Sequence, residues 1–193
     1  MRLGIFGGTF DPPHVGHLLA ATDALEQLRL DLVILVPAAT QPLKAGQCAA
    51  PPAQRLAMVR LMVRGDPRFD VSDVEVQRAG LSFTVDTLRH IAASHPSAER
   101  YLLLGADALS LFGQWREPER IVELARLAIL ERAGEPLHAL PPGVDPGRIE
   151  RLGTRRVDIS STEIRERVRR GKSIRGFVTD AVADVIARDG LYR

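Results

Sequence analysis

The chain has 193 residues, of which 45% are hydrophobic and 26% are charged, and its formal net charge is +2. This composition is typical of a globular protein with a substantial core, and the small net charge argues against a nucleic-acid-binding or membrane-binding protein. A lone cysteine excludes an internal disulfide framework and no signal-type stretch opens the chain, so we expect a cytoplasmic protein with no nucleic-acid or membrane partner.

The N-terminal stretch predicts a buried strand, a glycine turn and a helix. An apolar run at residues 3–6 is too short for a helix and breaks at Gly7 and Gly8, which is typical of a strand that ends in a tight turn. Residues that precede a proline avoid the α region, so we expect the helix to begin around Pro13. Apolar residues then recur at the spacing of one helical face, at Val15, Leu18, Leu19, Leu25 and Leu28.

Two histidines, His14 and His17, lie three residues apart at the start of this predicted helix. Side chains at this spacing share a face, and a helix start offers free backbone N–H groups and the positive end of the helix dipole. The motif therefore indicates an anion site. The alternatives are a solvated helix start and a weak metal site. No further ligand falls at a zinc-finger or protease-like spacing, so we predict no metal ligands in the protein.

The next part of the chain alternates between strand and helix patterns. Strand patterns occur at residues 31–36, 69–76, 101–104 and 125–130, and helical patterns at residues 56–63, 84–93 and 121–124. A loop with several prolines follows the first of these strands. Strands that alternate with helices form βαβ units, which require parallel strands and right-handed crossovers.

The C-terminal part contains an irregular connection and two further helices. Residues 132–147 combine proline and glycine too densely for a regular element, and residues 156–159 resemble a strand. Ser160 and Glu163 fit a capping box at the start of one helix. A last apolar stripe of helical spacing predicts a helix that ends near Gly190.

The whole pattern is α/β, and we expect a single domain over residues 1–193. Its core is a doubly wound, Rossmann-like parallel sheet with helices on both faces, followed by a small helical part at about residues 160–193. Ligands bind such sheets at the switch point, beyond the carboxyl ends of the strands. The histidine turn follows the first strand, and Gly105 and Asp107 follow the fourth. Asp107 can hold a ribose hydroxyl, although an ordinary helix N-cap is the alternative.

The helix that begins at Ser160 offers a second candidate anion site. Its first turn exposes N–H groups, and Arg165 lies about one turn further along, where a guanidinium suits phosphate. Residues 148–175 hold ten Lys or Arg against four Asp or Glu, a net charge of +6. A solvated, salt-bridged helix is the alternative, and we prefer that interpretation for the other arginines, Arg167, Arg169 and Arg170.

Several stretches resemble one family. GGTFDPPHVGH resembles the first signature of the bacterial nicotinate-nucleotide adenylyltransferases, which belong to the H-x-G-H nucleotidylyltransferase superfamily, and ISSTEIR resembles their second. VSDVEVQRAGLSFTVDTL, LLGADALSLFGQW and the final GLY are similar to the same family. Its members transfer the adenylyl group of ATP to nicotinate mononucleotide, which yields deamido-NAD and pyrophosphate. The resemblance implies this reaction, with ATP and nicotinate mononucleotide as the small-molecule substrates and with Mg²⁺ held mainly by the ATP phosphates.

The resemblance also implies roles for individual residues. It implies that the catalytic residues are His14, His17, Lys44 and Arg165. It implies that ATP contacts Gly7, Gly8, Thr9, Phe10, His14, His17, Gly105, Asp107, Ile159, Ser160, Ser161 and Arg165. It implies that nicotinate mononucleotide contacts Thr9, Lys44, Ser82, Phe83, Thr84 and Trp115. Backbone N–H groups at Phe83 and Thr84 would receive the nicotinate carboxylate, and Trp115 would stack on the pyridine ring, with core packing as its alternative.

The sequence departs from the family at two positions and leaves other functions open. Leu43 replaces the histidine that usually precedes Lys44, and Phe83 replaces a common tyrosine. One rival is another H-x-G-H adenylyltransferase with a pantetheine-phosphate or nicotinamide mononucleotide acceptor. A second is a catalytically silent nucleotide-binding regulator, and a third is a metal-dependent hydrolase that uses the two histidines. A monomer and a homo-oligomer are equally compatible with the sequence.

Overall fold

Parallel strands form a single sheet in the computed structural model, which describes residues 1–42, 49–132 and 144–193. The strands of this sheet are β1 (Arg2–Gly8), β2 (Leu32–Pro37), β3 (Phe69–Val71), β4 (Glu99–Gly105), β5 (Arg126–Arg132) and β6 (Ile149–Thr154). Their order across the sheet is β3-β2-β1-β4-β5-β6. The chain therefore winds outward from β1 in one direction through β3 and in the other direction through β6, which is the doubly wound arrangement that we predicted.

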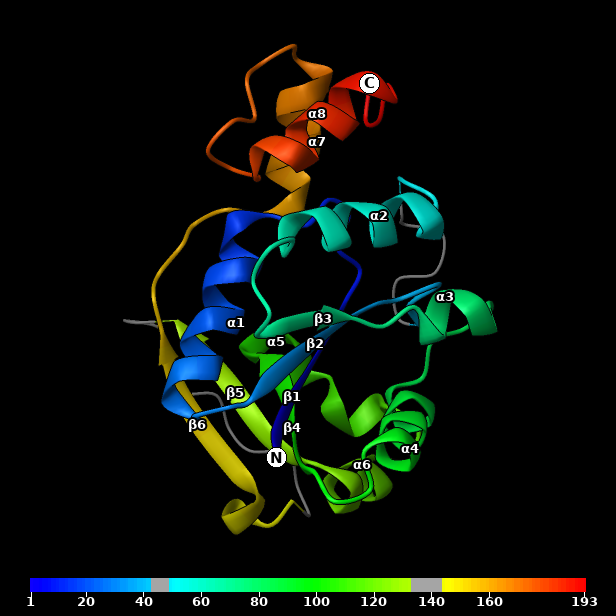
Figure 1. Ribbon diagram of the computed structural model, residues 1–193, viewed down its shortest axis with the longest axis vertical. Helices are drawn as coiled ribbons and strands as arrows, with labels where there is room; N and C mark the ends of the chain where they lie inside the picture. The colour runs from blue at the N-terminus through cyan, green and yellow to red at the C-terminus, as the bar shows by residue number, and fades with distance from the viewer. Residues whose placement is uncertain (43–48, 133–143) are drawn as a thin grey trace.

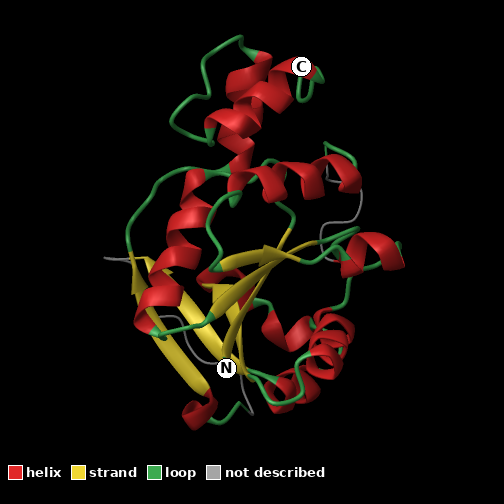
Figure 2. Ribbon diagram, in the orientation of Figure 1, coloured by secondary structure: helices red, strands yellow, loops and turns green. Residues whose placement is uncertain are grey.

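Helices cover both faces of the sheet (Figures 1 and 2). They are α1 (Val15–Gln27), α2 (Pro52–Met62), α3 (Val74–Arg78), α4 (Thr84–Ser94), α5 (Ala106–Ser110), α6 (Pro118–Leu124), α7 (Ser161–Arg169) and α8 (Asp180–Arg188). In Figure 1, α7 and α8 lie at the top of the view, beyond α1 and α2, while α4 and α6 lie at the lower right. In the described parts of the chain, no helix has the length and apolar character needed to cross a membrane.

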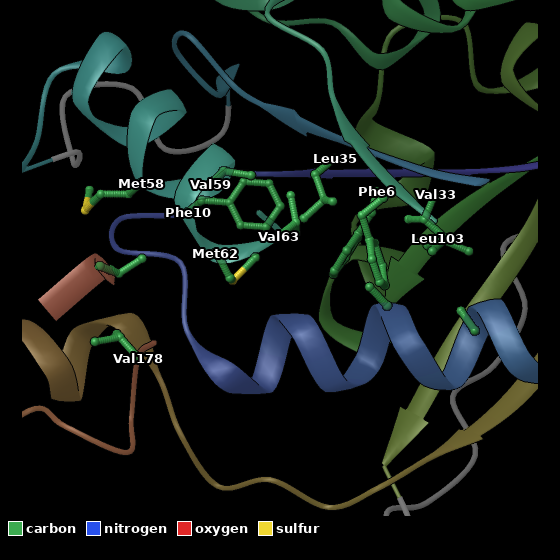
Figure 3. Packing of buried hydrophobic residues seen from close by; sticks show 14 of the residues in the cluster. Phe6, Phe10, Val33, Leu35, Met58, Val59, Met62, Val63, Leu103 and Val178 are labelled. Atoms are coloured by element: carbon green, nitrogen blue, oxygen red, sulfur yellow. The ribbon is translucent and has the colours of Figure 1, made fainter. Parts of the chain in front are cut away.

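The strands alternate their side chains between two hydrophobic clusters, one on each face of the sheet. In β2, Val33 and Leu35 pack beneath α1 and α2, whereas Ile34 and Val36 pack against α4 and its neighbours. Continuous apolar runs in the sequence follow from this burial on both sides. The first cluster, part of which is drawn in Figure 3, extends from Phe6 to the buried face of α8.

The third predicted strand, residues 69–76, is wrong beyond Val71. β3 lies at an edge of the sheet and pairs with β2 over three residues only, from Phe69 to Val71. The chain then leaves the sheet, and α3 begins at Val74. The apolar residues of this stretch therefore belong to a short helix, which turns Glu75 inward, and this residue is 7% exposed.

The strand predicted at residues 156–159 is also wrong, because the sixth strand lies earlier, at Ile149–Thr154. β6 is the other edge of the sheet and pairs only with β5, so its sequence alternates with charged residues and lacks a continuous apolar run. After β6, Arg155 binds the buried Asp23 of α1 through its backbone N–H and its guanidinium, each at 2.9 Å. This contact directs the chain toward α7. The predicted irregular connection at 132–147 lies partly outside the described residues, and it ends in a 3₁₀ turn at Pro146–Arg148.

Candidate active site

The carboxyl ends of β1 and β4 lie side by side at the switch point of the sheet. β1 pairs with β2 on one side and with β4 on the other. A pocket with a volume of about 160 Å³ opens at this edge, and Gly7, Gly8 and Gly105 belong to its lining. The absence of side chains on the three glycines lets a ligand approach the backbone closely.

The turn after β1 is held by aromatic packing. Phe10 adopts a left-handed backbone conformation with φ of +50° and is only 1% exposed. Its ring meets those of Phe6 and His17 edge-on, with centroid distances of 5.8 and 5.0 Å. A non-glycine residue keeps such a conformation only where its surroundings hold it there. Phe10 therefore fixes the path of the turn behind the histidines.

The two histidines meet at the start of α1, as the sequence predicts. The helix begins at Val15, two residues later than the predicted start at Pro13, because His14 adopts the extended conformation of an N-cap. The two imidazole rings lie 3.7 Å apart between centroids. A Cβ atom at Gly16 would lie 3.0 Å from Nδ1 of His14, so the glycine between the histidines provides the space for that ring.

Burial and hydrogen bonding define the state of His17. The backbone N–H of His14 donates to Nδ1 of His17 at 3.2 Å, so the neutral imidazole carries its proton on Nε2. Burial, together with the charge of a protonated His14, lowers the pKa of His17 well below its usual 6.5. His17 is therefore neutral at pH 7 in the free protein and offers an N–H donor to a ligand.

This shift predicts a loss of stability in acid. The pKa of folded His17 lies below its unfolded value of 6.5, so the stabilisation is complete above pH 6.5 and is lost as the pH falls through the folded pKa. We expect the free energy of unfolding, measured in urea, to fall between pH 7.5 and pH 5 less steeply in His17→Gln than in the wild type. His90→Gln, at an exposed position on α4, is the control for the loss of a histidine away from the turn. Equal slopes for His17→Gln and the wild type would contradict the shift.

Ser161 and Arg165 reach the histidine turn from the far end of the chain. Ser160 caps α7, since its hydroxyl accepts the N–H of Glu163 at 3.1 Å. The Ser161 hydroxyl donates to the Pro12 carbonyl at 2.8 Å, and Nη1 of Arg165 donates to the Asp11 carbonyl at 2.8 Å. The predicted phosphate-binding residues are thus beside the histidines, and they also brace the turn that carries them.

Ser82, Phe83, Thr84 and Trp115 line the pocket, and they approach it from α4 and from the segment after α5. Phe83 is the N-cap of α4, so the next N–H groups of the chain have no acceptor within the helix. The Ser82 hydroxyl accepts the N–H of Ala39 at 2.9 Å, which connects the start of α4 to the segment after β2. Trp115 is half-buried and packs on Phe112 with 5.5 Å between ring centroids, so it both contacts the core and lines the pocket.

The remaining predicted residues lie at separate places, and one of them is not described. The Thr9 hydroxyl donates to Oε1 of Gln41 at 3.0 Å, at the border between the histidine turn and the pocket. Ile159 packs against the first hydrophobic cluster just before α7. Asp107 lies in the first turn of α5. Lys44 lies outside the described residues.

The sequence analysis missed three residues of this region. Glu75 lines the pocket, where burial raises its pKa and the Thr87 hydroxyl donates to it at 2.5 Å. Arg116 also lines the pocket, and its guanidinium lies 4.9 Å from the centre of the Phe83 ring. Arg55 is fully buried and donates to the carbonyls of three separate segments. Only Arg116 has a sequence signal, its place next to the single tryptophan.

The side chains near the histidine turn indicate how a metal ion could be held. In the described residues, no three His, Cys, Asp or Glu side chains form a group that could hold a metal ion. The carboxylate in the histidine turn, Asp11, accepts the N–H groups of Ala49 and Ala50 and the hydroxyl of Tyr192. Magnesium retains water and binds phosphate oxygens well, so these residues fit an ion that is carried by a nucleotide.

Comparisons with known proteins agree with this architecture. A family model described as cytidylyltransferase-like matches residues 5–167. A probable nicotinate-nucleotide adenylyltransferase of Gemmatimonas aurantiaca is 51% identical over 198 residues, which cover 100% of this chain and 93% of the relative. One of Thermus thermophilus is 46% identical over the full length of both chains. The fold matches that of Plasmodium falciparum nicotinic acid mononucleotide adenylyltransferase complexed with NaAD, with a TM-score of 0.76, 20% identity and coverage of 99% and 97%.

Proposed function

This chain belongs to the nicotinate-nucleotide adenylyltransferases of the cytidylyltransferase-like family, and we propose that the cleft between β1 and β4 is where it carries out their reaction. The enzyme transfers the adenylyl group of ATP to nicotinate mononucleotide, which yields deamido-NAD and pyrophosphate in NAD biosynthesis. The observation that carries the placement is the histidine pair, 3.7 Å apart at the start of α1 and braced by Arg165.

The reaction depends on electrostatic stabilisation more than on covalent catalysis by the protein. A phosphate monoester attacks the α-phosphorus of ATP directly, so charge repulsion and the charge of the leaving pyrophosphate dominate the barrier. His17 offers its Nε2–H to the triphosphate, His14 lies beside it, and the N-terminus of α1 adds its dipole. No protein nucleophile is needed.

Arg165 and the serines complete the phosphate site in this proposal. The guanidinium uses one N–H on the Asp11 carbonyl and one on the Thr162 hydroxyl, at 2.8 and 3.2 Å. A guanidinium has five N–H donors, and the other three make no hydrogen bond to the described residues, so they can bind phosphate oxygens. Ser160, Ser161 and Ile159 hold ATP at the start of α7. The other ATP contacts of the proposal are Gly7, Gly8, Thr9, Phe10, Gly105 and Asp107.

Magnesium enters this proposal as part of the nucleotide substrate. Bound to the ATP phosphates, it would neutralise part of their charge and so favour attack by the anionic acceptor. The protein's own task is to hold the phosphates with His17, Arg165 and the amides of the turn.

The other substrate occupies the pocket lined by Ser82, Phe83, Thr84 and Trp115. A carboxylate is well placed at the N-terminus of α4, where N–H groups lack acceptors, and the flat face of Trp115 suits a pyridine ring. Arg116 adds a cation at the same wall. We assign the acceptor's phosphate to Thr9 and Lys44, and we place the reaction in the cytoplasm.

The test is pyrophosphate release from magnesium-ATP with nicotinate mononucleotide and nicotinamide mononucleotide offered in parallel. We expect kcat/KM for the nicotinate form to be greater by about tenfold or more, because the amide group cannot replace a carboxylate at the N-terminus of α4. Equal use of the two acceptors would contradict the pocket assignment. No release with either acceptor would contradict the reaction itself.

A further inference from the structure

The penultimate residue of the chain reaches back to the histidine turn. The Tyr192 hydroxyl donates to Oδ1 of Asp11 at 2.8 Å, across 181 positions of sequence. Both side chains are buried, with exposed fractions of 7% for Tyr192 and 2% for Asp11. Burial and the neighbouring Asp11 carboxylate raise the pKa of Tyr192, so its hydroxyl stays protonated and acts as a donor.

Asp11 joins three parts of the site through this contact. Its carboxylate accepts the N–H groups of Ala49 and Ala50, at 2.7 and 3.1 Å, just before α2. Its backbone carbonyl accepts Nη1 of Arg165. A buried carboxylate needs several donors to offset the cost of desolvation. Among its donors in the described part of the chain, only the Tyr192 hydroxyl comes from the C-terminal end.

A buried cation lies behind the same turn. Arg55 is 0% exposed and donates to the carbonyls of Thr9, Ala39 and Ala50, at 2.6, 2.9 and 3.1 Å. Arg55 and Arg165 both act electrostatically on the Tyr192 hydroxyl, as Asp11 does. We call these four side chains, Asp11, Arg55, Arg165 and Tyr192, the Asp11 hub. They connect the turn after β1, the segment after β2, the start of α2 and the C-terminus.

The backbone conformation after α8 places the Tyr192 hydroxyl next to Asp11. After α8, Gly190 and Tyr192 both have positive φ, +64° and +66°. Glycine adopts this conformation freely, but for a tyrosine it is strained and persists only where other contacts hold the residue. In the segment after α8, the strain falls on the residue whose side chain enters the hub, which points to a role for the hydroxyl beyond filling space.

We propose that Tyr192 is a positioning residue of the adenylyltransferase site, which holds Asp11 and thereby fixes the histidine turn against Arg165 for binding of the ATP triphosphate. The kinetic effects that we expect rest on the proposed function. The contacts that support the inference do not depend on which acceptor the enzyme uses. The hydroxyl does not contact the substrate. It acts through Asp11 and the backbone between Asp11 and His14.

The experiment compares Tyr192→Phe with Tyr101→Phe, which alters the chain's only other tyrosine. Tyr101 is 1% exposed, and its hydroxyl donates to Glu99 at 2.7 Å and accepts from Arg2, near the amino end of β4 and away from the site. Each variant removes one tyrosine hydroxyl from a hydrogen-bond network, which is buried around Tyr192 and partly exposed around Tyr101. Each should lower Tm by a few degrees, about 4 °C, and only Tyr192→Phe should change the site.

The readouts are Kd for a non-hydrolysable ATP analogue by calorimetry, KM for each substrate and hydrogen exchange, all well below Tm. For Tyr192→Phe we expect Kd and KM for the nucleotide to rise about fivefold, whereas KM for nicotinate mononucleotide changes less than about twofold. Amides in the peptide that spans residues 8–18 should exchange faster in this variant than in Tyr101→Phe. Because Kd does not depend on turnover, the inference is tested even if no acceptor is adenylylated.

Two results would overturn the proposal. One is a Kd in Tyr192→Phe within about twofold of the wild type, with unchanged exchange at residues 8–18. The other is an equal rise of Kd in both phenylalanine variants, which would show that loss of either tyrosine hydroxyl loosens the protein. If Tyr192→Phe melts too low for calorimetry, exchange at residues 8–18 at low temperature, compared with Tyr101→Phe, decides the question alone.

Discussion

Replacing His17 with alanine should lower kcat by about 100- to 1000-fold, the effect of removing one aligned donor from a charge-stabilising site. The Nε2–H of His17 is available because Nδ1 accepts the backbone N–H of His14, so no rotation of the ring is required when the phosphates arrive. Alanine removes the donor and keeps the helix. The measurement is the initial rate of pyrophosphate release at saturating magnesium-ATP and nicotinate mononucleotide.

The control must separate loss of the donor from loss of packing. His17 contacts the Phe10 ring, so His17→Ala will also cost some stability. His17→Phe retains an aromatic ring against Phe10 without the N–H donor and should be as slow as His17→Ala. A near-normal rate in either variant, with the fold verified by circular dichroism, would remove His17 from the mechanism.

Replacing Trp115 with alanine should raise KM for nicotinate mononucleotide by about 10- to 100-fold, which corresponds to the loss of one aromatic stacking platform. KM for ATP should change little, because we assign the ATP phosphates to the histidine turn. Trp115 is half-buried beside Phe112, so one face of the indole packs in the protein while part of it reaches the pocket. Steady-state kinetics with each substrate varied in turn provides the measurement.

Trp115→Phe is the matched variant for this prediction. Phenylalanine keeps an aromatic platform and part of the contact with Phe112, so KM for the mononucleotide should rise less than in Trp115→Ala. If Trp115→Ala lowers Tm but leaves both KM values unchanged, Trp115 serves only the core. That result would assign the pyridine ring to another wall of the pocket, such as the one that carries Arg116.

The predictable parts of the fold are those whose signal lies within a short stretch. β1, β2, β4 and β5 are buried on both faces, so each is a continuous apolar run that can be recognised without its neighbours. The edge strand β6 pairs with β5 alone and carries Glu150 and Arg151, so its sequence resembles a loop. At the other edge, β3 pairs with β2 over three residues only, and Val74 begins a helix.

The candidate site also contains some residues that local sequence patterns predict and others that they do not. The histidine pair, its intervening Gly16 and the cap at Ser160 depend on spacing within one helix turn, so their geometry was predictable. Nothing near Arg55 in the sequence indicates that its three acceptors come from three segments, and nothing in the final residues indicates that Tyr192 meets Asp11.

The sequence by itself determined the α/β class, the doubly wound order, the helix start that carries His14 and His17, and the residue types suited to phosphate. These features depend on periodicity, glycine and proline placement and hydrogen bonds between close neighbours, all of which are local. Only the tertiary structure decided which distant groups meet: Arg165 with the histidine turn, Glu75 with the pocket, and Tyr192 with Asp11. Such contacts are set by strand order and helix packing, which bring together residues that no local pattern relates.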